Sequence, residues 1–132
     1  HRYLHSYPTR RSSDLKHPTG GGLLTPIYII HPFKGKGGEY EVNKERVSRI
    51  CRLITAECPH VLPISPIHAF GFTDDTVPEE RVKALELCKQ LLRTVAQAEG
   101  EAWVYGEWQT SSGCLGEVEL ARQLGIPLRF HS

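Results

Sequence analysis

The sequence predicts an α/β domain: a three-layer, Rossmann- or flavodoxin-like arrangement with a parallel sheet of four to five strands and helices on both faces. Short apolar, β-branched runs alternate along the chain with longer segments whose apolar residues recur at helical spacing. A strand–helix–strand alternation of this kind is typical of parallel sheets with right-handed crossovers. The length of 132 residues allows one domain with a substantial core.

The first half of this pattern contains two strands and one helix. A strand is expected at 27–30, followed by the glycine-rich stretch KGKGG. A helix is expected at 43–57, with an apolar stripe formed by Val47, Ile50, Cys51 and Ile54. Pro59 ends this helix, and HVLPIS (60–65) forms a second short strand. The segment 66–75 is then expected to be a loop.

The second half begins with a helix at 76–95. Thr76 and Glu79 have capping-box spacing and Pro78 suits the first turn. We expect strands at 101–106 and 126–130, and between them a helix at 111–125 with serine caps at its start and Gly125 after its end. The buried stripe of the 76–95 helix should consist of Val82, Leu85, Cys88 and Leu92.

Residues 1–25 are expected to lie outside the folded domain, which should span 26–132. The segment His5–Leu15 resembles one reading frame of a common short-read sequencing adapter, which implies an artefactual tail. An alternative is a basic arm that binds a partner. The net charge of +1 depends on residues 1–16, which hold Arg2, Arg10, Arg11 and Lys16 against Asp14.

Composition excludes several classes of function. The near-neutral charge gives no reason to expect nucleic acid or an anionic membrane as a partner, and no apolar run is long enough to span a bilayer. The four cysteines, at 51, 58, 88 and 114, form no CxxC pair and no zinc-ligand spacing. We therefore expect reduced thiols in a cytoplasmic protein, with no metal and no cofactor.

Candidate binding residues follow the first two strands. Lys34 and the glycines after it, Gly35 among them, could hold an anion, although a surface loop of this composition is also common. The side chains of His31, Phe33, His68 and Phe70 could stack on a base or simply fill the rim of the core. Asp75 could hold a sugar hydroxyl, or could stabilise the start of the next helix.

The stretch SSGCLGEVELA contains the candidate catalytic residue. Ser111, Ser112 and Gly113 would place hydroxyl and backbone N–H groups at a helix N-terminus, which suits an anion. Glu117, on the second turn, should lie at the helix edge and face the strand ends. We expect the helix dipole to help keep it ionised, which suits a carboxylate nucleophile, but most helix glutamates are simply solvated.

The order of several motifs resembles one known family. IYIIHPFKG, Asn43, PISPIHAF, FTDD, PEER, EAWVYG and SSGCLGEVELARQLGIPLRF occur in this order between Pro26 and Phe130. They are similar to the nucleoside 2-deoxyribosyltransferase-like proteins, in particular to an uncharacterised bacterial and phage branch in which the asparagine recurs.

The resemblance implies a glutamate nucleophile four residues before an alanine, which corresponds to Glu117 and Ala121. It also implies that the loop after the first strand, His31, Pro32, Phe33, Lys34 and Gly35 included, contacts sugar or 5′-phosphate. The sequence departs from the family in three places. Ser111 stands where the transferases have an aspartate six residues before the nucleophile, Ser-Ser-Gly-Cys (111–114) stands where the uncharacterised branch usually has Ser-Glu-Gly-Met, and Gly100 stands where that branch often has an acidic residue. These departures bear on base recognition and on activity.

The expected function is cleavage or transfer at the N-glycosidic bond of a nucleoside or nucleoside 5′-monophosphate, through a carboxylate nucleophile. One alternative is a nucleotide-binding or interaction module of the same fold without the chemistry. A third is an enzyme acting on another glycosyl donor, such as a dinucleotide. The resemblance also implies a homo-oligomer.

Overall fold

A computed structural model describes residues 22–34 and 39–131, and these form a three-layer α/β domain. The four strands are β1 (Thr25–Ile30), β2 (Val61–Ile64), β3 (Glu101–Val104) and β4 (Leu128–Phe130). All neighbouring pairs are parallel, and the sheet order is β2-β1-β3-β4. The predicted fold class is therefore confirmed. The tail of residues 1–21, and Gly35 among the candidate site residues, lie outside the described residues.

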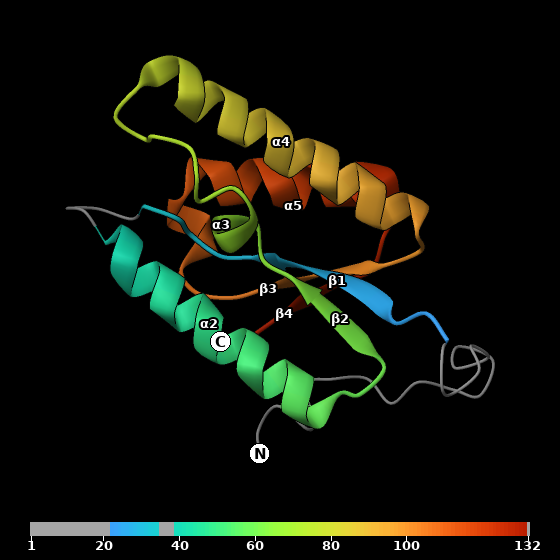
Figure 1. The fold of residues 1–132 in the computed structure, drawn as a ribbon. Coiled ribbons are helices and arrows are strands. Elements are labelled where there is room, and N and C mark those ends of the chain that lie inside the picture. Colours follow the sequence, from blue (N-terminus) through green and yellow to red (C-terminus); the bar gives the residue numbers. More distant parts are fainter. Residues whose placement is uncertain (1–21, 35–38, 132) are drawn as a thin grey trace.

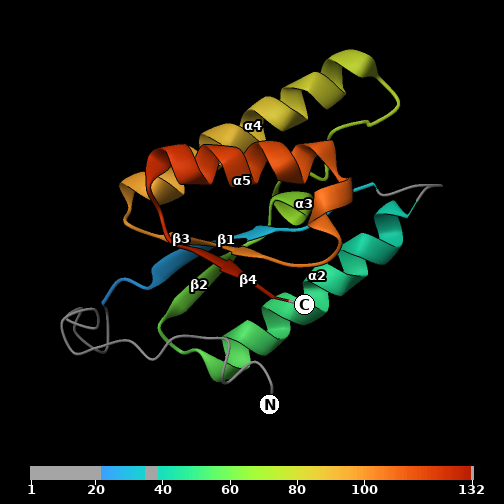
Figure 2. The same ribbon diagram turned by 180° about the vertical axis from the view of Figure 1, so that it is seen from behind.

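The helices are α2 (Tyr40–Glu57), α3 (Pro66–Ala69), α4 (Pro78–Gln97) and α5 (Ser112–Leu124), with a 3₁₀ turn η1 (Trp108–Thr110). Helices α4 and α5 lie on one side of the sheet and α2 on the other (Figures 1 and 2). No helix in the described part of the chain is both long enough and apolar enough to cross a bilayer.

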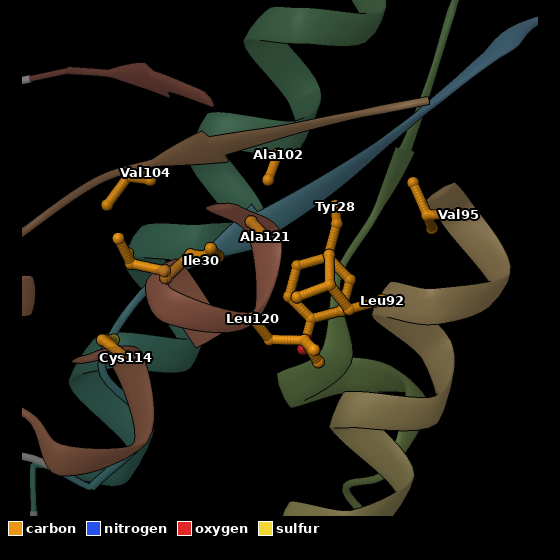
Figure 3. Packing of buried hydrophobic residues seen from close by; sticks show 10 residues of the cluster. Tyr28, Ile30, Leu92, Val95, Ala102, Val104, Cys114, Leu120 and Ala121 are labelled. Carbon is orange, nitrogen blue, oxygen red and sulfur yellow. The ribbon is translucent and has the colours of Figure 1, made fainter. Parts of the chain in front are cut away.

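Each face of the sheet has its own hydrophobic core. Tyr28 and Ile30 of β1 pack with α4 and α5, whereas Ile27 and Ile29 pack with α2. This two-residue alternation follows from the pleat of a strand, and it explains why β1 is apolar throughout. In the first core Tyr28 lies beside Leu92 of α4 and Leu120 of α5 (Figure 3).

The order of the strands creates a topological switch point between β1 and β3. The connection from β1 leads to β2 on one side, and the connection from β2 returns to β3 on the other side. Ile30 and Val104 end the two strands side by side, and the Tyr105 N–H donates to the Ile30 carbonyl oxygen. Ligands of open parallel sheets bind in the crevice at such a point.

Three sequence expectations about local structure are wrong. Residues 66–69 form the short helix α3 rather than a loop, with Pro66 at its first position. The capping box at Thr76 does not form, because the helix begins at Pro78 after Val77, which provides no side-chain cap. Instead, the Thr76 hydroxyl donates to Asp74 and the Glu80 carboxylate accepts from the Asp74 N–H.

The third error concerns the stripe on α4. Cys88 and Leu92 are buried as expected, but Val82 is 67% exposed and Leu85 is 48% exposed. Toward its N-terminus α4 rises away from α5 in both views (Figures 1 and 2). The first turns of α4 therefore cannot reach the core, although their spacing follows the helical pattern.

Candidate functional site

A cleft of about 680 Å³ lies at the carboxyl ends of the strands. Its walls come from the residues after β1, the first turns of α2, the N-terminal half of α4 and the first two turns of α5. Ten of the thirteen residues predicted from the sequence line it: His31, Pro32, Phe33, Lys34, Asn43, Asp75, Ser111, Ser112, Gly113 and Glu117.

Glu117 lines this cleft from the second turn of α5, and its side chain is buried with only 8% exposed. The Tyr28 hydroxyl donates a hydrogen bond of 2.5 Å to Glu117 Oε2. Burial raises the pKa of Glu117 to about 7, and the Tyr28 hydrogen bond and the charge of Lys89 act in the opposite direction. Burial has the largest effect on this pKa, so the carboxyl is only partly ionised near neutral pH.

Tyr28 was not foreseen from the sequence as a site residue, although its position carried a signal. In an apolar strand with period-two alternation, Tyr28 lies on the same face as Ile30. That face is the one covered by α5, so a polar phenol there needs a buried partner. Burial and the Glu117 charge raise the pKa of Tyr28 well above its usual value, so its hydroxyl stays protonated and donates.

Two thiols also line the cleft near Glu117. Burial raises the pKa of Cys88 on α4 and of Cys114 on α5 to about 12 in each case. Both are therefore neutral and poorly nucleophilic at physiological pH. Neither thiol therefore competes with Glu117 as a reactive group in this cleft.

The N-terminus of α5 forms a second wall. The Ser111 side chain caps the helix by accepting from the Cys114 N–H at 3.2 Å, as the sequence predicted. The backbone N–H groups of Ser112 and Gly113 lie in the first turn, where the helix dipole favours negative charge. An anionic or hydroxyl-rich group would find donors there.

Asn43 holds the loop after β1 in place. Its side chain is 3% exposed, and its Nδ2 group donates to the Phe33 carbonyl oxygen at 3.0 Å. The same loop is tied across the cleft by an ion pair of 3.2 Å between Lys34 and Asp75. Asn43 is therefore a positioning residue for the cleft wall.

Several charged residues of the cleft were also not foreseen from the sequence. Arg46 of α2 and Arg81 of α4 line it, together with Glu39 and Glu107. The Arg81 guanidinium lies 4.0 Å from the Asp75 carboxylate. Helical spacing placed Arg46 and Arg81 on the polar faces of their helices, but nothing in the sequence distinguished the faces that meet at the cleft. Glu39 and Glu107 lie outside the predicted helices.

His68 and Phe70 do not line the cleft. The Ser48 and Ser65 hydroxyls hydrogen-bond the two ring nitrogens of His68 at 2.8 and 2.6 Å and hold it against α2 and the start of α3. Phe70 makes an edge-on contact with Phe72, with ring centroids 6.3 Å apart. The formation of α3, which was not expected, turns these side chains away from the switch point.

Among residues 22–34 and 39–131, no group of three or more His, Cys, Asp or Glu side chains is arranged to hold a metal ion. The site therefore consists of a buried carboxyl, neutral hydrogen-bonding groups and several charged side chains. Such a set suits acid–base or nucleophilic chemistry on an uncharged or anionic ligand.

The family described as "Domain of unknown function (DUF7768)" matches residues 25–131. The chain belongs to this family. No curated protein and no solved structure gave a match. The matched range begins with the first residue of β1 and covers every element of the sheet, so the whole cleft lies within the family domain.

Proposed function

We propose that this domain cleaves or transfers the glycosyl group at the N-glycosidic bond of a nucleoside or nucleoside 5′-monophosphate. The observation that carries the proposal is Glu117, a buried carboxyl in a cleft at the β1/β3 switch point with a tyrosine hydroxyl on one of its oxygens. The resemblance to the nucleoside 2-deoxyribosyltransferase-like proteins adds support, since it points to the same glutamate.

The reaction needs one nucleophile and one proton. The ionised Glu117 carboxylate forms a bond to the anomeric carbon while the carbon–nitrogen bond breaks. The base leaves with the electron pair of that bond and takes a proton from water, which becomes hydroxide. A second base, or water, then attacks the same carbon, gives its proton to that hydroxide and releases the Glu117 carboxylate. The charge that develops on the sugar resembles an oxocarbenium ion, which a nearby carboxylate stabilises.

The hydrogen bond from Tyr28 gives the two carboxylate oxygens of Glu117 different roles. Its hydroxyl occupies Oε2, which leaves Oε1 for the substrate. The hydrogen bond also lowers the pKa of Glu117 against the effect of burial, so a substantial fraction is ionised near neutral pH.

The rest of the cleft suits the remainder of the substrate. A volume of about 680 Å³ falls within the range of small-molecule sites. Donors at the first turn of α5 would hold sugar hydroxyls or a 5′-phosphate, and Lys34 and Arg46 add positive charge. The base would then lie toward the wall formed by Leu85 of α4.

A second candidate function is nucleotide binding without turnover. The observation that favours it is the burial of Glu117, which keeps about half of the carboxyl protonated at neutral pH. Ser111 also stands where the transferases that the chain resembles have an aspartate. Such a module would bind the same ligands in the same cleft and release no base.

Base release tests both candidates. The full chain is incubated with ribo- and deoxyribonucleosides, their 5′-monophosphates and a nicotinamide dinucleotide, and free base is separated by chromatography. We expect release from at least one donor, and its loss in Glu117→Gln. Glu119→Gln is the matched control, because it makes the same change on an exposed residue of α5. Ligand-induced thermal shifts without any release would favour the binding module.

A further inference from the structure

A second cluster of polar side chains joins α2 to α3. His68 of α3 pairs with two serines: its Nε2 lies 2.8 Å from Ser48 Oγ on α2, and its Nδ1 lies 2.6 Å from Ser65 Oγ. The three residues are exposed or half-buried, so small molecules in solution can reach them. A serine hydroxyl on one nitrogen of an imidazole, with a third group on the other nitrogen, is the arrangement of an activated nucleophile.

The imidazole of His68 is neutral at physiological pH. Burial lowers its pKa, and the charge of Lys44 lowers it further. A neutral ring has one N–H donor and one lone pair. One serine therefore donates its hydroxyl hydrogen to the ring, and the other accepts a hydrogen bond from it.

The surroundings of Ser48 indicate which serine donates. Hydroxyl groups inside a helix commonly donate to the carbonyl oxygen one turn earlier. Thr55 of α2 does so, with its hydroxyl 2.8 Å from the Cys51 carbonyl oxygen. In the described part of the chain Ser48 makes no such bond to Lys44, because its hydroxyl lies against His68 Nε2 instead. The Ser48 hydrogen is therefore directed at Nε2, and Nδ1–H donates to Ser65.

We propose that Ser48 is a nucleophile that takes the acyl group of activated esters of small carboxylic acids, with His68 as its general base. Ser65 is a positioning residue, because its hydrogen bond to Nδ1 fixes the tautomer and the orientation of the ring. Lys44 lies one turn before Ser48 on α2, and its ammonium group stabilises the oxyanion that forms on the attacked carbonyl. None of these four residues lines the cleft that contains Glu117.

The reaction consumes only ester and water. Ser48 Oγ forms a bond to the carbonyl carbon, and its proton passes to His68 Nε2. The tetrahedral intermediate then expels the alcohol, which takes that proton. Water attacks the acyl group in the same way and releases Ser48, so the products are the acid and the alcohol. Because the cluster is exposed, it gives a large substrate little to bind, which is why the esters are small and activated.

A fluorophosphonate probe traps such a nucleophile, since the serine oxygen bonds to phosphorus and fluoride leaves with the proton. The full chain is incubated with the probe at neutral pH, and adducts are counted by intact mass and located by peptide mapping. We expect one adduct, on Ser48, and none in Ser48→Ala. Thr55→Ala is the matched control, because it removes from the same helix a hydroxyl that is directed at a carbonyl oxygen. No adduct on the wild-type chain, or adducts at other residues only, overturns the proposal.

His68→Gln separates the base from the hydrogen bond. Glutamine keeps an amide that can pair with a serine, but it cannot take a proton. We expect the rates of probe labelling and of p-nitrophenyl acetate hydrolysis to fall about 100-fold or more. His60→Gln, which makes the same change at another exposed histidine, should react as fast as wild type. All rates are measured well below the melting temperature of each variant, and equal rates in wild type and His68→Gln overturn the proposal.

Conservative pairs test the other two roles. Ser65→Ala should slow p-nitrophenyl acetate hydrolysis about tenfold, whereas Ser65→Thr returns the hydroxyl and should restore the rate. Lys44→Gln should slow hydrolysis about tenfold or more, whereas Lys44→Arg keeps the charge and most of the rate. A purely structural role would not follow the hydroxyl and the charge in this way. Unchanged rates in Ser65→Ala and Lys44→Gln overturn the roles assigned to these two residues.

The tautomer can be observed in the untreated protein. Long-range ¹H–¹⁵N spectra at neutral pH should show a neutral His68 ring with its proton on Nδ1. A proton on Nε2, or a charged ring, overturns the proposal, because Nε2 then has no lone pair to take the proton of Ser48. Neither result bears on Glu117, whose role is tested separately by base release.

Discussion

The pKa of Glu117 is set by opposing effects. Burial in the cleft disfavours its charge, whereas the Tyr28 hydroxyl and the more distant Lys89 favour it. The outcome is a pKa of about 7, so that about half of the carboxyl is ionised at neutral pH. Tyr28 and Glu117 are 89 positions apart in the sequence, so only the fold brings them together.

Removal of the Tyr28 hydroxyl should move the activity to higher pH. In Tyr28→Phe, Glu117 loses the hydrogen bond that lowers its pKa, so a smaller fraction is ionised at neutral pH. We expect base release at about pH 7 to fall, with the rise of the pH–rate profile displaced by about one pH unit. The control is Tyr40→Phe, whose hydroxyl donates to the Ile67 carbonyl oxygen instead. Identical profiles for wild type and Tyr28→Phe would show that this hydrogen bond does not tune the reaction.

Glu117 should also make stability depend on pH. Its folded pKa of about 7 exceeds the ordinary value of 4.5, so the folded state binds this proton more tightly than the unfolded state does. The resulting stabilisation is complete below pH 4.5 and is lost as pH rises through 7. Glu117→Gln lacks this loss, so its free energy of unfolding relative to wild type should increase by about 2–3 kcal/mol between about pH 5 and pH 8.

Urea denaturation of both proteins at about pH 5 and pH 8 measures this difference. Glu119→Gln, exposed on the same helix, should show no comparable change. If the difference between Glu117→Gln and wild type is the same at both pH values, Glu117 is already ionised at the lower pH and the burial argument fails.

At the scale of the secondary-structure element, helix ends and close contacts between backbone segments restrict which residues a position can hold. Helix α5 has the start and end that its sequence predicted, a serine cap at Ser111 and a left-handed Gly125 after its last turn.

Gly100, immediately before β3, lies where two other segments approach the backbone closely. A Cβ there would lie 2.2 Å from the Pro26 carbonyl oxygen and 2.6 Å from Val95 Cγ1. An acidic side chain at this position is therefore incompatible with the close approach of β1 and α4.

Gly100→Ala and Gly116→Ala should have opposite effects on stability. The first forces β1 and the end of α4 apart, and we expect a loss of about 1–3 kcal/mol. The second lies inside α5, where a Cβ meets nothing within 4 Å, so the better helix propensity of alanine should add up to about 1 kcal/mol. Urea unfolding of the two variants beside wild type gives both values. A Gly100→Ala protein as stable as wild type would mean that the approach at Pro26 relaxes easily.

At the scale of the whole molecule, the fold class and most of the cleft were predictable because both depend on order and periodicity. Alternating strands and helices imply that His31, Lys34 and Glu117 all lie near the same end of the sheet. Periodicity does not specify how far a helix tilts, so the exposure of Val82 on α4 was not foreseen. Nor does it specify short helices such as α3, which turns His68 away from the cleft.

The same architecture predicts that the two cores unfold together. Successive residues of β1 enter opposite cores, Ile29 on the α2 side and Ile30 on the side of α4 and α5. Loss of either core removes packing from a strand that the other core needs, so we expect a single cooperative transition.

Trp103 reports on the core beneath α2, and Trp108→Phe leaves it as the only tryptophan of the chain. Its fluorescence should follow the same urea curve as the helical signal in far-UV circular dichroism, to which α4 and α5 contribute. A nucleotide that binds the cleft should displace both curves equally, by about 2.7 kcal/mol at about one hundred times its Kd. Two separate unfolding transitions would mean that the two cores are stable independently of each other. A ligand that displaces only one of the two curves would mean that the cleft is formed by one layer rather than by α2, α4 and α5 together.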